Sequence, residues 1–199
     1  ALRRELDSRF YPPDFARKVK VSDEVLAGLP ARWFVRTGAE RTDRVVLYLH
    51  GGSFLYGSAR TTHAELIARL AFESGVAAVG VDYRLAPEHP YPAALEDATR
   101  AFEALVATGL APERIVIGGD SSGGNLALAL QLVLRDRGVR AGGLVLLSPW
   151  TDLTMPGVSY VDNDPFDYGT RAELARHAAV YAGSHALDEP PVSPMFAEL

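Results

Sequence analysis

The chain has 199 residues, of which 48% are hydrophobic, and its net charge is -5. This length and composition fit one globular domain with a substantial core. The acidic balance and the absence of any lysine and arginine cluster argue against a surface for nucleic acid or an anionic membrane, and favour a small neutral or apolar substrate. No apolar run reaches the roughly 18 residues of a membrane span, so we expect a soluble, cytoplasmic protein, with a removed secretion signal as the open alternative.

Two classes of site are excluded by composition and spacing. The chain contains no cysteine, which rules out disulfides and thiolate metal sites. Its histidines are scattered, and no pair of them has the spacing of metal ligands. We therefore expect no metal site.

The amino-terminal part of the chain has weak patterns. Residues 1–30 mix charges, aromatics and prolines, as a short helix followed by a loop would. Two short alternating stretches, residues 18–21 and 32–36, predict strands. The first strong strand pattern is the apolar run of residues 45–49, and its unbroken apolar character predicts burial on both faces, as in a parallel sheet.

Helices and buried strands alternate through the rest of the chain. One helix is capped at Thr61 or Thr62 and ends at Gly75, and another is opened by Pro92 and ends at Gly109. Further buried strands are predicted over residues 76–81, 114–118 and 143–148. This alternation predicts a doubly wound, mostly parallel sheet with right-handed crossovers.

The last part of the chain is polar and rich in turns. Residues 151–169 have this character, and Thr170 and Glu173 then have the spacing of a capping box. The capping box predicts a helix that reaches Gly183.

The most informative stretch is GGDSSGGN, residues 118–125, between an apolar run and a long run of helix formers. It predicts a strand, a sharp turn and a helix, which is the setting of a nucleophile elbow. A serine at such a turn has strained backbone geometry that exposes its hydroxyl, and Gly119 and Gly123 allow the close approach of other backbone. Ser121 is therefore the candidate nucleophile.

An ordinary polar turn is the alternative interpretation, because GxSxG also occurs by chance. A second motif favours the catalytic interpretation. HGGSF, residues 50–54, directly follows the predicted strand 45–49, and the two motifs stand in the order expected of one catalytic site.

The pairing of HGGSF with GDSSGGN, joined by VDYRLAPEHPYPAALEDA and followed by LLSPWTDL, resembles the hormone-sensitive-lipase-like esterases of the α/β-hydrolase fold. The resemblance covers most of the chain from about Trp33 onward. It implies one α/β-hydrolase domain over residues 1–199, with helical cap contributions from residues 1–30 and 151–183. It also implies hydrolysis of carboxylic esters of short to medium acyl chains through a serine acyl-enzyme, without a cofactor.

The resemblance implies roles for the motif residues. Ser121 attacks the ester carbonyl, and backbone N–H groups hold the oxyanion that forms. His50 orients the loop that carries these groups and is not the general base. The expected oxyanion donors are the amides of Gly51, Gly52, Ser53 and Ser122. The expected supports of the elbow are Gly119, Asp120 and Gly123.

Two motif residues depart from the family pattern. The family usually has a third glycine in place of Ser53 and an alanine in place of Ser122. Backbone donation survives either change. The Ser53 side chain either narrows the alcohol side of the pocket or hydrogen-bonds a substrate, and both alternatives stay open.

The acid and base of the triad are harder to find. In α/β-hydrolases they follow the serine, on loops after later strands. After Ser121 the histidines are His177 and His185, for which a surface or lid position is the ordinary interpretation, and Asp152 is the best-placed acid. We expect the triad acid and histidine to lie outside this chain, with these three residues as a weak fallback, and the domain to be truncated before its last strands.

Two consequences follow if the triad acid, the histidine and the last strands lie outside this chain. A missing strand would leave residues 144–147 as an unprotected sheet edge, so we expect self-association. Without a base, the chain alone should be a weak or inactive esterase.

The alternative functions are a non-catalytic small-molecule-binding protein of the same fold, and an acyl transferase or amidase with the same nucleophile. A strained serine argues against the pure binding protein.

Overall fold

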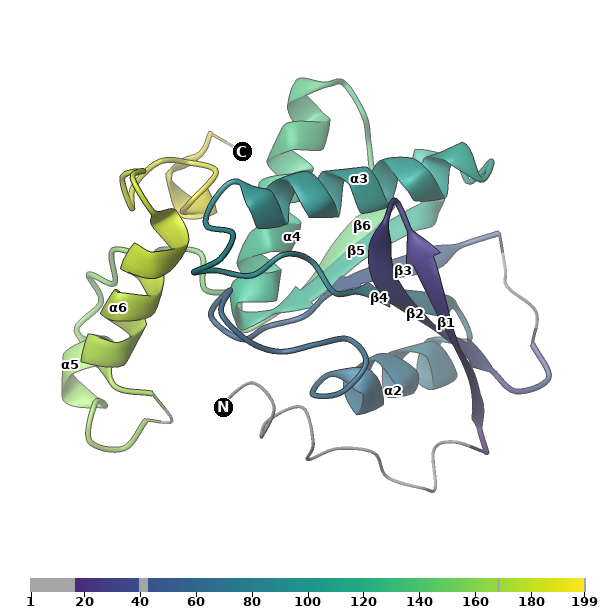
Figure 1. Ribbon diagram of the computed structural model, residues 1–199, viewed down its shortest axis with the longest axis horizontal. Coiled ribbons are helices and arrows are strands. Elements are labelled where there is room, and N and C mark those ends of the chain that lie inside the picture. Colours follow the sequence, from purple (N-terminus) through teal and green to yellow (C-terminus); the bar gives the residue numbers. More distant parts are fainter. Residues whose placement is uncertain (1–16, 40–42, 168, 199) are drawn as a thin grey trace.

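A computed structural model describes residues 17–39, 43–167 and 169–198, which contain a six-stranded sheet of order β1-β2-β4-β3-β5-β6 (Figure 1). The strands β4, β3, β5 and β6 are parallel to one another, and β1 and β2 add an antiparallel hairpin at one edge. The strands are β1 (Val19–Leu26), β2 (Leu29–Arg36), β3 (Val45–Leu49), β4 (Ala77–Val81), β5 (Ile115–Asp120) and β6 (Gly143–Leu147). The predicted doubly wound, mostly parallel sheet is confirmed.

Helices cover both faces of this sheet. In Figure 1, α3 and α4 lie on one face and α2 lies on the other. The core is accordingly divided into two clusters, a larger one between the sheet and α3 and α4, and a smaller one beneath α2. The helices are α2 (Ala64–Ser74), α3 (Ala93–Ala107), α4 (Ser121–Asp136), α5 (Ser159–Asp162) and α6 (Arg171–Ala182), with short 3-10 turns η1 (Pro112–Arg114) and η2 (Pro194–Phe196).

The strands with unbroken apolar runs form the centre of the sheet. All five residues of β4 are buried, and in β3 only Val46 is partly exposed. Because parallel strands are covered on both faces, alternation between polar and apolar residues is absent there. The carboxyl ends of strands β3 and β5 lie side by side, since Leu49 pairs with Gly119. The loops that follow these two strands therefore start from neighbouring positions.

The hairpin β1–β2 corrects the expected boundary of the amino-terminal segment. Residues 19–30 belong to the sheet and to its turn at Ala27 and Gly28, where φ is 53° and 80°, and are not loop or cap. Residues 1–16 lie outside the described residues, so their cap role stays a prediction.

The strand β6 lies at the other edge of the described sheet, next to β5. Two of its apolar side chains, Val145 and Leu147, are 40% and 38% exposed. An apolar edge of this kind favours pairing with another chain. Self-association through β6 stays a prediction. Within the described ranges, no helix has the length and apolar character needed to cross a membrane.

The buried carboxylate of Asp97 on α3 leads to a prediction about stability and pH. Asp97 is completely buried and accepts hydrogen bonds from the Arg84 backbone N–H at 2.8 Å and from the Arg84 and Arg100 guanidinium groups. Burial alone would raise the pKa of Asp97, but the bonds from both arginines outweigh it and lower the pKa below 3.8. The charged form is therefore favoured in the folded state.

Replacing Asp97 with asparagine is expected to lower the free energy of unfolding at pH 7 by about 2 kcal/mol, because charge-assisted hydrogen bonds are lost while the shape is kept. A lowered folded pKa means that this contribution is complete above the unfolded value of 3.8 and disappears as the pH falls through the folded value. Urea unfolding of the wild type and of Asp97→Asn should show that the difference in their free energies of unfolding narrows below about pH 4. The control Glu96→Gln removes only an exposed pair with Arg84 and should cost less than about 1 kcal/mol. An equal loss in both variants would contradict the prediction.

Candidate active site

The candidate nucleophile lies where β5 meets α4 without an intervening loop. Asp120 is the last residue of β5 and Ser121 is the first residue of α4. Ser121 has φ of 49°, in the left-handed region that residues with side chains rarely occupy. Its carbonyl oxygen accepts a hydrogen bond from Trp150 N–H at 2.9 Å. Among the described residues, none hydrogen-bonds to the Ser121 hydroxyl.

The sharp turn depends on two glycines. A Cβ on Gly123 would overlap the carbonyl oxygens of Leu49 and His50, and a Cβ on Gly119 would overlap the carbonyl oxygen of Gly123. All of these atoms belong to backbone, which cannot move aside as a flexible side chain would. Only glycine fits at either position, which brings the elbow directly against the end of β3.

The loop after β3 carries the HGGSF motif and is folded back by left-handed residues. The φ angles of Gly52, Ser53 and Phe54 are 123°, 52° and 61°. The N–H groups of Leu55 and Tyr56 donate to the Gly52 carbonyl at 2.9 and 3.0 Å, which closes the turn. Within the part of the chain that the structure describes, no group accepts a hydrogen bond from the amides of Gly52, Ser53 or Ser122. These three N–H groups can therefore donate to a ligand.

Gly51 has a different role from the expected one. Its N–H donates to Asp120 Oδ1 at 3.0 Å, and a Cβ at Gly51 would overlap the Asp120 carboxylate. Because this amide already has a strong acceptor, Gly51 is not a free donor for an oxyanion. Gly51 thus attaches the loop to the elbow, and an oxyanion role for the amides of Gly52, Ser53 and Ser122 stays a prediction.

The Asp120 carboxylate accepts hydrogen bonds from three separate elements. Besides Gly51, the Tyr48 hydroxyl of β3 donates to it at 2.9 Å, and His63 Nε2, just before α2, lies 3.1 Å from Oδ2. Burial alone would raise the pKa of Asp120, but the hydrogen bonds from His63, Tyr48 and Gly51 outweigh it and lower the pKa. Asp120 is therefore an ionised acceptor at neutral pH.

His63 is not among the residues that the sequence motifs pointed to. A carboxylate only accepts hydrogen bonds, so the contact requires a proton on His63 Nε2. On the other side of the ring, His63 Nδ1 lies 2.8 Å from the Thr62 hydroxyl. Nothing in the local sequence signals this role, because 57 residues separate His63 from Asp120.

His50 is completely buried and packs within the loop that it begins. Its ring stacks on Tyr83 with centroids 4.4 Å apart, and Nδ1 donates to the Gly51 carbonyl at 2.8 Å. Burial lowers the pKa of His50 to about 4, so the ring is neutral at pH 7. These contacts agree with a side chain that orients the loop.

The three fallback triad residues contact groups other than Ser121, and His177 does so through its ring alone. Asp152 accepts from the backbone N–H and hydroxyl of Thr154 at 2.8 and 2.6 Å. His185 is exposed and lies 2.9 Å from the Glu189 carboxylate, and the ring of His177 lies edge-on to Tyr56. In the described ranges, no hydrogen bond joins any of them to Ser121. Among the described residues, no pair of an acid and a histidine is hydrogen-bonded to the Ser121 hydroxyl.

Within the described residues, no group of three or more histidine, aspartate or glutamate side chains is arranged to hold a metal ion.

Comparison with known proteins extends over the whole chain. A family described as alpha/beta hydrolase fold matches residues 46–199. An esterase from Acinetobacter venetianus is 37% identical over 209 residues, which cover 100% of this chain and 66% of that protein. The crystal structure of EstE5 soaked with p-nitrophenyl butyrate matches with a TM-score of 0.91 and 34% identity, over 100% of this chain and 66% of EstE5. EstE7, a hormone-sensitive-lipase homologue from a metagenome library, matches with a TM-score of 0.90 and 33% identity, over 98% of this chain and 67% of EstE7.

This chain thus spans about two thirds of the length of these three proteins. The match includes the β3 loop, the elbow and the helices on both faces of the sheet. By sequence and by fold, the chain belongs to the hormone-sensitive-lipase-like esterases of the α/β-hydrolase fold.

Proposed function

We propose that this chain forms the nucleophile and oxyanion site of a carboxylic ester hydrolase that acts on short to medium acyl esters. The observation that carries the proposal is the strained Ser121, at φ of 49°, beside three backbone amides that have no acceptor among the described residues. A positive φ at a serine costs about 1–3 kcal/mol, which a pure binding protein has no reason to retain.

The contacts of the elbow support the position of the amides. The two residues that flank Ser121 bind the loop. Asp120 accepts a hydrogen bond from Gly51 N–H, and Ser122 accepts one from Phe54 N–H. Gly51 and Phe54 in turn flank the pair Gly52 and Ser53. The pair is therefore held next to the nucleophile.

In the proposed reaction, Ser121 Oγ attacks the ester carbonyl and the amides of Gly52, Ser53 and Ser122 stabilise the oxyanion. A general base takes the Ser121 proton and gives it to the alcohol that leaves when the tetrahedral intermediate collapses, and water then hydrolyses the acyl-enzyme to release the acid and restore Ser121. Loss of one oxyanion donor typically costs about 10²–10³ in rate. Short acyl chains are proposed because EstE5, a similar protein, was soaked with p-nitrophenyl butyrate.

The general base and its acid are proposed to come from outside residues 1–199. Asp152 and His185 already have partners, and in this fold the acid and histidine follow later strands. A serine hydroxyl without a base is a poor nucleophile at neutral pH. The 199 residues alone are therefore expected to have weak or no esterase activity.

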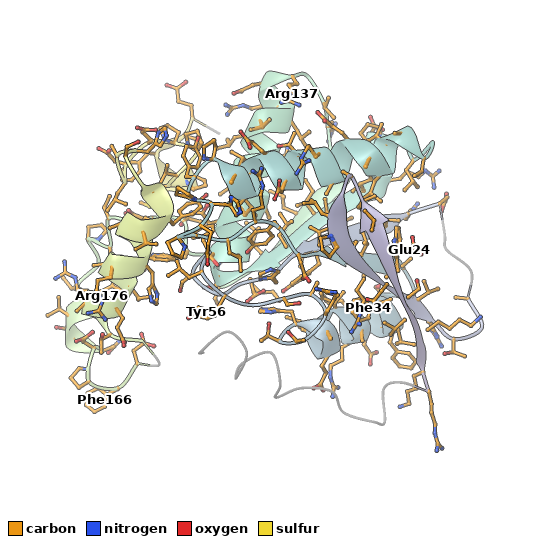
Figure 2. The ribbon with its side chains drawn as sticks, viewed as in Figure 1. Glu24, Phe34, Tyr56, Arg137, Phe166 and Arg176 are labelled. Atoms are coloured by element: carbon orange, nitrogen blue, oxygen red, sulfur yellow. The ribbon has the colours of Figure 1, made fainter. Side chains whose placement is uncertain are left out.

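Residues 151–183 are proposed to cover the pocket. Two ring contacts between α6 and the HGGSF loop region support this role. The ring of Tyr181 stacks on that of Phe54 with centroids 3.5 Å apart, and the ring centroids of His177 and Tyr56 are 6.2 Å apart. The outer end of the segment carries Phe166, which is 87% exposed and lies away from the sheet (Figure 2).

The test treats the complete protein with a fluorophosphonate and with p-nitrophenyl esters of increasing acyl length. We expect one phosphonate per chain, located on Ser121 by peptide mass spectrometry, and fastest hydrolysis of short to medium esters. Labelling of another residue would contradict the assignment of Ser121, and no labelling would contradict the proposal and favour a binding protein. Matched p-nitroanilides test the amidase alternative, which would require amides to react faster than esters.

A further inference from the structure

The two residues that flank Ser121 hydrogen-bond to the two residues that flank the pair Gly52 and Ser53. The Asp120 side chain accepts from Gly51 N–H at 3.0 Å, and the Ser122 hydroxyl accepts from Phe54 N–H at 3.2 Å. In each case the acceptor is a side chain of the elbow and the donor is backbone of the HGGSF loop. Two hydrogen bonds therefore connect the elbow to the loop, one at each end of the Gly52 and Ser53 pair.

The Ser122 side chain is well defined by its surroundings. It is completely buried, and it also interacts with the hydroxyl of Tyr83. Tyr83 in turn donates to the carbonyl oxygen of His50, the first residue of the motif. Ser122 thus contacts Phe54 directly and His50 through Tyr83, so its hydroxyl is linked to both ends of the loop.

The Asp120 carboxylate is equally constrained. Tyr48 and His63 donate to its two oxygens, and Thr62 supports the His63 ring from the other side. A carboxylate with three donors has little freedom to rotate. Its distance from the Gly51 amide is therefore set by β3 and by the start of α2.

The loop needs such contacts because its backbone is strained. Ser53 and Phe54 both have left-handed φ angles, 52° and 61°, although neither is glycine. Strained residues of this kind persist only where surrounding contacts over-determine them. An alanine in place of Ser122 would leave the Phe54 amide buried without its acceptor.

We propose that the Ser122 hydroxyl is a positioning residue that, together with the Asp120 carboxylate, holds the Gly52 and Ser53 amides in place for the oxyanion. This inference rests on the proposed function and adds a side-chain role to a residue so far considered for its backbone N–H alone. The physical reason is that oxyanion stabilisation depends on donors that are already oriented before charge develops.

The first test is Ser122→Ala in the complete protein. We expect kcat for a p-nitrophenyl ester to fall about 10–100-fold with KM changed by less than about threefold, since ordering of the amides matters most in the transition state. Amide hydrogen exchange of the peptide that contains residues 51–56 should accelerate at least about tenfold, because the Phe54 amide loses its acceptor.

The matched control is Ser193→Ala. Ser193 is also completely buried and also accepts a backbone N–H, from Leu153 at 2.8 Å, but it lies outside the elbow. We expect it to lower Tm about as much as Ser122→Ala while kcat and exchange of residues 51–56 stay unchanged. Equal losses of kcat in the two variants would show a general effect of stability and overturn the proposal.

The exchange measurement separates this inference from the proposed function. If the wild-type protein neither hydrolyses esters nor reacts with the fluorophosphonate, the proposed function fails, while the exchange comparison still decides whether Ser122 holds the loop. Unchanged exchange and unchanged kcat in Ser122→Ala would overturn the inference alone. Where that variant fails to fold, Asp120→Ala is expected to have the same kinetic and exchange signature, because it removes the acceptor of the Gly51 N–H, and its wild-type behaviour would overturn the inference as well.

Discussion

Replacement of Ser121 with alanine is expected to lower ester hydrolysis by the complete protein about 10⁵-fold and to abolish fluorophosphonate labelling, because the attacking oxygen is removed. Steady-state hydrolysis of p-nitrophenyl butyrate and intact-protein mass measure both effects. Residual hydrolysis above the uncatalysed rate is expected from the oxyanion amides, which the substitution leaves in place.

Two companion variants sharpen this result. Ser184→Ala changes an exposed serine and should retain full activity and labelling. Ser121→Gly should be as inactive as Ser121→Ala but more stable than it by about 1 kcal/mol, since glycine adopts a positive φ without strain. Activity of Ser121→Ala within tenfold of wild type would rule out Ser121 as the nucleophile.

The second large effect is expected for Gly123→Ala, which should lower the free energy of unfolding by about 3 kcal/mol through overpacking. The added Cβ would overlap the carbonyl oxygens of Leu49 and His50, which are backbone at the end of β3. Moving them also moves the HGGSF loop, so activity should fall further than stability alone explains. Urea unfolding and ester hydrolysis measure the two losses.

Gly157→Ala is the matched control for this substitution. The nearest atom to its added Cβ is the Ser159 hydroxyl at 3.6 Å, which is ordinary contact. Its stability should therefore change by less than about 0.5 kcal/mol. Wild-type stability of Gly123→Ala would mean that the elbow lies further from β3 than the structure places it.

The sequence was sufficient to predict the central elements, because their signals are local. The apolar run of β3 and the Thr170 and Glu173 capping box appear in the structure at the residues expected. The hairpin β1–β2 was only partly predicted. Five of the eight residues of β1 are exposed, so this edge strand has little apolar pattern to detect.

The sequence by itself also determined which residues form a strand, sharp turn and helix around Ser121, since glycines and a strained serine are properties of a short stretch. Only the tertiary structure decided which amides of the HGGSF loop are available. Gly51 donates to Asp120, 69 residues away, and His63 reaches the same carboxylate from the start of α2. A local motif specifies which backbone groups stand near the nucleophile. The pairing of each donor with an acceptor depends instead on how β3, β5 and α2 pack together, and no single stretch of the chain determines that packing.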